Sequence, residues 1–137
     1  MKVALSFQEI SRAIRRLTAP PFDLVVGIGR GGIVPASLIA YHLQSDLITA
    51  RFTYRDDDNQ PQHDAPVLRS LDAVPDGVRT VLLVDDVSVT GKTLEAARQH
   101  FDGYAVTTLV LKGRADIVLF PEIRTCVKWP WNPVGST

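Results

Sequence analysis

Two adjacent carboxylates, Asp85 and Asp86, follow the apolar run Val81 to Val84 and precede a hydroxyl-rich turn. Such a run is typical of a buried parallel strand, so the carboxylates are expected at its carboxyl end, where open α/β sheets bind ligands. Carboxylates in this position can accept hydrogen bonds from the vicinal hydroxyls of a sugar. The pair is therefore the first candidate for substrate binding.

The turn after the carboxylates supplies donors for an anion. Its residues, Ser88 to Thr93, place hydroxyl and backbone N–H groups at the start of a predicted helix, whose dipole favours a phosphate. The segment is not a Walker A loop, because Asp86 stands where that pattern requires glycine. Carboxylates and turn together suit a ribose monophosphate. The alternative is a solvated turn that only ends a strand.

A second candidate is the segment Gly27 to Ile33, in which glycines surround Arg30. Glycines allow the backbone to approach a ligand closely, and a guanidinium offers five N–H donors to phosphate oxygens. The pattern therefore suits a diphosphate. A tight turn between a strand and a helix is the alternative, since a short glycine pattern alone is a weak signal.

Hydrophobic periodicity places these segments among alternating strands and helices. Ser6 and Glu9 form a candidate capping box for a first helix over about 6–18, which Pro20 and Pro21 end. Strands that alternate with helices predict an α/β fold with an open parallel sheet and right-handed crossovers. The other expected elements are strands at 23–28, 47–54, 81–84, 104–111 and 117–120 and helices at 33–43 and 90–100.

Two further groups of charged residues have open interpretations. Arg12, Arg15 and Arg16 face outward on the first predicted helix, and a solvated face is preferred over a phosphate-binding patch. The polar stretch from Arg55 to Gly77 is too long for an ordinary connection and is predicted to be a lid. Its acidic run, 56–58, is interpreted as solvation of the loop, with metal binding as the alternative.

Composition limits the remaining possibilities. The chain has 137 residues, 45% of them hydrophobic, with 15 basic and 15 acidic side chains, which predicts one domain over 1–137. Balanced charge and the lack of a long apolar run argue against nucleic acid and membrane partners. The chain has a single cysteine, Cys126, so an intramolecular disulfide is excluded, in agreement with a cytoplasmic location. Cys126 is expected to be a small buried residue.

The run from Val81 to Thr93 resembles the phosphoribosyl-diphosphate (PRPP) binding motif of type I phosphoribosyltransferases. Three further segments, 30–36, 54–60 and Lys112 with the later Pro130-Trp131, look like xanthine-guanine phosphoribosyltransferases and their relatives. The resemblance implies an open parallel sheet flanked by helices, with a small hood over the base formed mainly by about 112–132. It also implies Mg²⁺ and a homodimer or homotetramer.

By this resemblance, the chain moves the 5-phosphoribosyl group of PRPP to a nucleobase and releases diphosphate. Asp85, Asp86 and Arg30 would be the catalytic residues, and the two carboxylates would hold Mg²⁺ mainly through water or ligand atoms. Arg30, Gly31 and Gly32 would bind the diphosphate, and the loop 55–69 would close over the site. The expected PRPP- and nucleotide-binding residues are Asp85, Asp86, Val87, Ser88, Val89, Thr90, Gly91, Lys92 and Thr93.

The expected base-binding residues are Lys112, Val127 and Trp129. Lys112 would contact the exocyclic oxygen of a 6-oxopurine, and Trp129 would stack on the base or pack within the hood. The sequence departs from the 6-oxopurine pattern twice, with Val89 in place of an aspartate and Cys126 in place of a stacking aromatic. A different base or nitrogen acceptor, or a non-catalytic module that responds to PRPP or nucleotide, therefore remain as alternatives.

Overall fold

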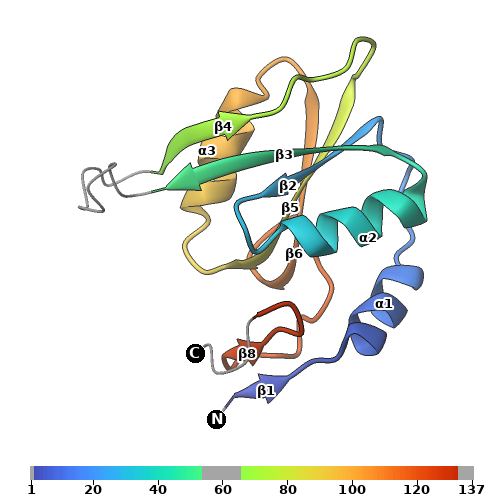
Figure 1. Cartoon of the computed structure of the whole chain (residues 1–137), viewed down its shortest axis with the longest axis vertical. Coiled ribbons are helices and arrows are strands. Elements are labelled where there is room, and N and C mark those ends of the chain that lie inside the picture. Colours follow the sequence, from blue (N-terminus) through green and yellow to red (C-terminus); the bar gives the residue numbers. More distant parts are fainter. Residues whose placement is uncertain (1, 54–65, 133–137) are drawn as a thin grey trace.

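A computed structural model describes residues 2–53 and 66–132 of the chain. Its main sheet has six strands in the order β4-β3-β2-β5-β6-β7 (Figure 1). Neighbouring strands are parallel except at the β3–β4 edge, where the pair is antiparallel. The strands are β2 (Leu24–Ile28), β3 (Asp46–Thr53), β4 (Val67–Leu71), β5 (Thr80–Ser88), β6 (Ala105–Gly113) and β7 (Ile117–Val118).

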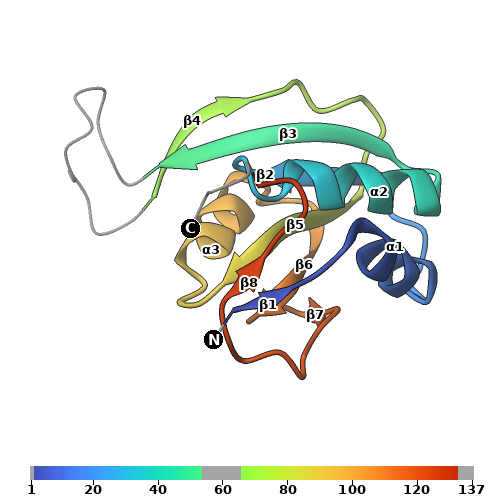
Figure 2. The same ribbon diagram turned by 60° about the horizontal axis from the view of Figure 1, so that its bottom comes forward.

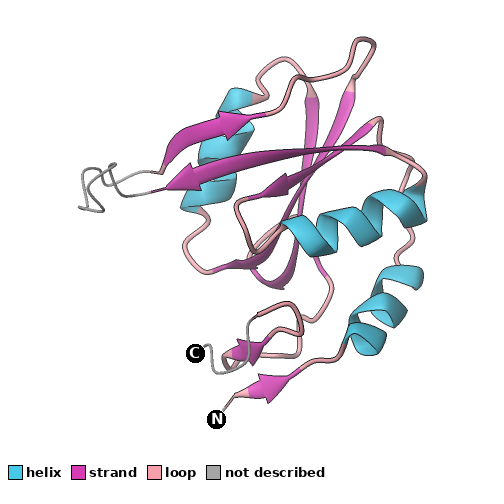
Figure 3. Cartoon of the chain, viewed as in Figure 1, coloured by secondary structure: helices cyan, strands magenta, loops and turns pink. Residues whose placement is uncertain are grey.

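Helices cover both faces of this sheet, as the colouring in Figure 3 makes plain. The helices α1 (Phe7–Arg15) and α2 (Ile33–Leu43) pack on one face around Val25, Leu82 and Leu109. The helix α3 (Lys92–His100) packs on the other face, where Leu83 and Phe101 are buried. The predicted α/β fold with an open, mostly parallel sheet is therefore confirmed, whereas the antiparallel strand β4 was not predicted.

Two short strands form a second sheet beside the first. The strand β1 (Val3–Ala4) pairs in parallel with β8 (Val127–Lys128), and Figure 2 shows them side by side. Backbone bonds from Val3 N to Cys126 O (2.9 Å) and from Leu5 N to Lys128 O (3.2 Å) continue the connection. The amino-terminal segment thus pairs with the carboxyl-terminal part of the predicted hood, while residues 112–118 belong to β6, β7 and their connection. That the segment of about 112–132 forms a hood over a base stays a prediction.

The helix and strand bounds differ from the predicted ones in an informative way. The capping box is confirmed, since Glu9 N donates to Ser6 Oγ (3.1 Å) and Ser6 N donates to Glu9 Oε1 (3.2 Å), but α1 ends at Arg15. The strand β5 continues four residues past Val84 because its backbone keeps pairing with β6, as in the match of Val87 with Lys112. Both candidate carboxylates therefore lie within a strand.

Candidate active site

The sheet order brings the two candidate loops together. The chain leaves β2 for β3 on one side and later returns to β5 on the other, so β2 and β5 are neighbours whose helices lie on opposite faces. This is the topological switch point at which open α/β sheets bind ligands. The loop after β2 contains Arg30 to Gly32, and the end of β5 contains Asp85 and Asp86.

Glycine is required where these loops meet. A Cβ atom at Gly31 would overlap the carboxylate of Asp86, and one at Gly32 would lie 2.6 Å from the carbonyl oxygen of Ile28. The predicted diphosphate loop and one predicted ribose carboxylate are thus in direct proximity. The sequence indicated the loop and the carboxylate separately, and the pairing of β2 with β5 puts them at the same edge of the sheet.

The two carboxylates form one electrostatic unit. Asp86 N donates to Asp85 Oδ1 and Val87 N donates to Asp86 Oδ1, both at 2.8 Å. Burial, and then the negative charge of Asp86 and a hydrogen bond with its side chain, raise the pKa of Asp85 to about 8. Adjacent half-buried carboxylates repel each other when both are ionised, and a cation or donor hydroxyls would relieve that repulsion.

The phosphate-binding turn is open at the start of α3. Gly91 is the N-cap residue of this helix, with φ at +82°, and as a glycine it provides no side chain to cap the helix. Thr90 Oγ1 accepts a long bond from Lys92 N (3.3 Å), and Ser88 is buried. The first N–H groups of a helix bind anions in this arrangement, so the predicted phosphate role is compatible with the geometry.

Lys112 and Val89, which the sequence assigns to the base side of the site, lie near the carboxyl ends of β6 and β5. Lys112 is half-buried near the carboxyl end of β6 and is paired in register with Val87 of β5. Val89 is 74% exposed, so the departure from aspartate removes a carboxylate from an open position without filling a core site. The structure therefore brings Lys112 to the same edge as the carboxylates.

The hood residues are arranged differently from the expectation. Trp129 is only 5% exposed, belongs to the hydrophobic core and stacks on Trp131, with ring centroids 5.3 Å apart. This is the packing alternative stated for Trp129. Val127 is half-buried in β8, and Cys126 is exposed, so the prediction of a buried cysteine was wrong. The cause is the pairing of β8 with β1, which leaves the Cys126 side chain at the surface.

A cavity of about 380 Å³ adjoins Arg30 on the β3 side and extends the site beyond the predicted residues. It also includes Thr49 and Arg51 of β3 and Ser70 of β4. Sequence reasoning missed Ser70 because it placed 55–77 in a lid, and it placed Thr49 and Arg51 in a strand without a role in the site. The alternation of Thr49 and Arg51 on one strand was the available signal. Residues 54–65 lie outside the described residues, and with them the acidic run 56–58 and the first part of the predicted lid.

The donor set at this edge fits a hard divalent cation. Within the described residues, no cluster of three or more His, Cys, Asp or Glu side chains is present, so Asp85 and Asp86 would act as a pair. Mg²⁺ is usually held by one or two carboxylates together with substrate phosphate oxygens and water. A pair of carboxylates beside the predicted phosphate-binding turn matches that preference.

Comparison with known proteins identifies the family and agrees with the fold. The profile of the phosphoribosyl transferase domain matches residues 4–130, so the chain belongs to this family of transferases. A xanthine-guanine phosphoribosyltransferase from Chromohalobacter salexigens is 31% identical over 93% of this chain and 82% of its own length.

Solved structures show the same architecture. The Helicobacter pylori xanthine-guanine-hypoxanthine phosphoribosyltransferase superimposes with a TM-score of 0.80 at 16% identity, covering 96% of this chain and 94% of its own. A protein from Neisseria gonorrhoeae with bound ppGpp has a TM-score of 0.71 at 25% identity, covering 98% of this chain and 92% of its own. The predicted family is therefore confirmed.

Proposed function

We propose that the chain transfers the 5-phosphoribosyl group of PRPP to a purine base, preferably a 6-oxopurine, and releases diphosphate. The observation that carries this proposal is the contact between the two loops, in which Gly31 lies against the Asp86 carboxylate, in the segment that leads to the helix start at Gly91. Membership of the transferase family and the xanthine-guanine relatives support it.

Each part of the site has a role in this reaction. Asp85 and Asp86 accept hydrogen bonds from the ribose hydroxyls, and the turn Ser88 to Thr93 binds the 5-phosphate. Arg30, with the N–H groups of Gly31 and Gly32, binds the diphosphate and stabilises the negative charge that it gains as the bond to the anomeric carbon breaks. Lys112 donates to the base oxygen and favours a carbonyl over an amine.

Mg²⁺ fits the carboxylate pair and, when bound, supplies positive charge that stabilises the leaving diphosphate. Asp85 and Asp86 would hold it mainly through water and substrate oxygens. The raised pKa of Asp85 means that ionisation of both carboxylates is favoured when a cation is present. Affinity for PRPP should accordingly depend on Mg²⁺ and rise with pH toward about 8.

A panel of bases with radiolabelled PRPP tests the proposal. We expect nucleotide formation with hypoxanthine, guanine or xanthine, little with adenine, and none without a divalent cation. The double variant Asp85→Asn/Asp86→Asn should lose PRPP binding by about 2 kcal/mol or more, because charge-assisted hydrogen bonds are removed. Unchanged PRPP affinity in that variant would refute the site assignment, and product with adenine alone would refute the base assignment.

A nucleotide-responsive module without transferase chemistry is the second candidate. Val89 in place of a proton-transferring aspartate and the buried Trp129 favour it, and so does the 25% identical structure with bound ppGpp. The two candidates separate cleanly in calorimetry and turnover. A transferase binds PRPP with Mg²⁺ and turns over with a base, whereas a responsive module binds ppGpp and forms no nucleotide with any base of the panel.

None of the helices in the described residues is long and apolar enough to span a bilayer. We propose a cytoplasmic location on the basis of the substrates, since PRPP and free bases are cytoplasmic metabolites. A homodimer or homotetramer, as the family resemblance implies, is part of the same proposal and is testable by sedimentation.

A further inference from the structure

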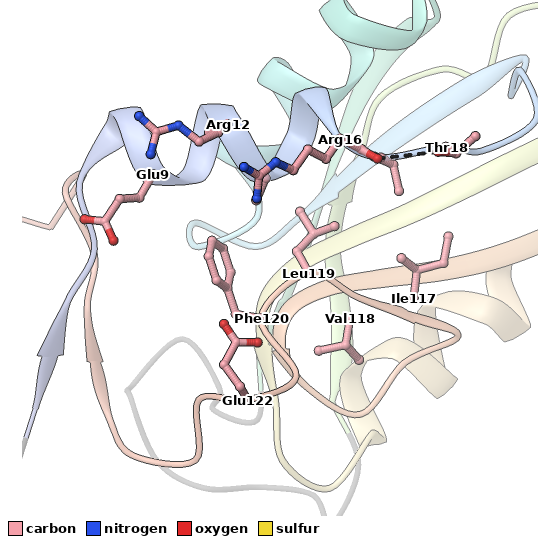
Figure 4. A pocket seen from close by; sticks show the side chains of 11 residues that line it. Glu9, Arg12, Arg16, Thr18, Ile117, Val118, Leu119, Phe120 and Glu122 are labelled. Atoms are coloured by element: carbon pink, nitrogen blue, oxygen red, sulfur yellow. Dashed lines mark hydrogen bonds between the residues drawn. The ribbon is translucent and has the colours of Figure 1, made fainter.

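A cavity separate from the carboxylate edge lies between α1 and the segment that follows β7. Its volume of about 590 Å³ falls in the range of small-molecule sites. Figure 4 shows Arg12 and Arg16 on the helix side, with Leu119, Phe120 and Glu122 on the opposite side. None of the residues assigned to PRPP, diphosphate or base lines this cavity.

The arginines of this cavity are available to a ligand. Arg12 and Arg16 are exposed and one helical turn apart, so they project from the same side of α1. In the part of the chain that the structure describes, neither guanidinium makes an ion pair or a side-chain hydrogen bond. Glu9, which also lines the cavity, is held by the capping box with Ser6. Two unpaired guanidinium groups at one end favour an anion, above all a phosphate.

The rest of the lining suits a flat ring. The half-buried side chains of Ile117, Leu119 and Phe120 provide an apolar surface, and Phe120 offers a ring face. Glu122 places a carboxylate on the same side, and this group accepts hydrogen bonds and donates none when ionised. A ring that presents an amino group beside an imino N–H would donate to both carboxylate oxygens, whereas a ring with the imino N–H alone would leave one oxygen unpaired.

We propose that this cavity is a second ligand site, which takes a purine nucleoside monophosphate whose base carries an amino group. The phosphate would bind Arg12 and Arg16, the base would lie against Leu119 and Phe120, and Glu122 would accept from the N–H edge of the base. GMP meets these requirements, whereas IMP lacks the amino group. The proposal concerns binding at a second place and does not depend on the transferase reaction.

The test is a titration of the isotope-labelled chain with GMP, followed residue by residue by NMR. The background is Asp85→Asn/Asp86→Asn, which weakens nucleotide binding at the carboxylate edge, and its spectrum also reports whether the variant is folded. We expect GMP to shift signals of Arg12, Arg16 and Phe120 saturably. Shifts confined to the turn around Gly91 would refute the second site.

Three variants distinguish the assigned contacts from general charge. Arg12→Gln/Arg16→Gln should weaken GMP binding at the cavity at least tenfold. Arg15→Gln removes a charge from the same helix but does not line the cavity, and it should leave the affinity unchanged. Equal loss in both variants would mean non-specific attraction and would overturn the proposal.

The proposed contact between Glu122 and the base is tested separately. The chain should bind GMP at least about fivefold more tightly than IMP at this site, and Glu122→Gln should remove that preference without affecting inorganic phosphate. Equal affinity for GMP and IMP in the chain with Glu122 intact would refute the assignment of an amino-substituted base.

Discussion

Asp85→Asn tests the electrostatic account of the site without any ligand, because asparagine keeps the shape of the side chain and removes its ionisation. In the folded chain the pKa of Asp85 is raised from its usual 3.8 to about 8, first by burial and then by Asp86. Between these two values the folded state binds a proton that the unfolded state has released. The contribution of Asp85 to stability is therefore fully present below about pH 4 and is lost as the pH rises toward about 8.

The size of this effect follows from the shift. One proton difference changes the free energy of unfolding by about 1.4 kcal/mol per pH unit, so the full shift would correspond to roughly 5–6 kcal/mol. Asp85 is only half-buried, and water that reaches its carboxylate moderates the repulsion. We therefore expect Asp85→Asn to be roughly 2–3 kcal/mol more stabilising relative to the unsubstituted chain at pH 8 than at pH 5.

Urea denaturation at pH 5, 6, 7 and 8, in the presence of a chelator, measures this difference. Asp102→Asn is the matched control, since it removes an exposed aspartate that follows α3. The free-energy difference between the control and the unsubstituted chain should stay nearly constant over this range. A constant difference for Asp85→Asn as well would mean that Asp85 ionises normally in the folded chain, and would refute the coupling with Asp86.

Three further predictions concern the proposed reaction. Gly31→Ala should weaken PRPP binding at least tenfold in calorimetry, because its Cβ would displace the Asp86 carboxylate, and should have little further effect in an Asp86→Ala background. Arg30→Ala should lower turnover more than it weakens binding of a nucleoside monophosphate, because Arg30 is assigned to the diphosphate. If the variant instead lost affinity for the monophosphate, the loop at Arg30 would be the 5-phosphate site and the turn 88–93 the diphosphate site. Val89→Asp should raise kcat/KM for a 6-oxopurine substrate by as much as about 10²-fold at unchanged PRPP affinity, since general acid–base catalysis contributes about 10²–10⁴-fold. Steady-state assays check this last prediction, and a lower kcat/KM would show that the missing carboxylate is no handicap.

The sequence was sufficient for the core of the fold because its signals are local. The apolar runs of β2 and β5, the capping box of α1 and the glycines around Arg30 each determine their own segment. Alternation of strands and helices then leaves few topologies. The contact of Gly31 with Asp86 follows from that topology, because it requires only that β2 and β5 be neighbours.

The elements that were missed depend on distant partners. The strand β4 has only five residues, follows a long polar stretch and pairs with the edge of β3, with a shift in register between Arg51 and Phe52. The strands β1 and β8 have two residues each and exist only as a pair that joins the two ends of the described chain. The burial of Trp129 follows from the same pairing. Local sequence patterns contain no information on such contacts.

The two halves of the site are consequently constrained in different ways. The sugar-phosphate half depends on backbone geometry, in which Gly31 allows the close approach to Asp86 and Gly91 adopts a positive φ before α3. A side chain in place of either glycine would alter the loop backbone and with it the geometry of the site. The base half depends on side chains alone: Val89 is 74% exposed, Cys126 is exposed, and Lys112 is half-buried at a strand end. Substitutions there cost the fold little. In the proposed site, base selectivity is thus the property that can change while PRPP binding is retained, and the departures at Val89 and Cys126 lie in the part assigned to the base.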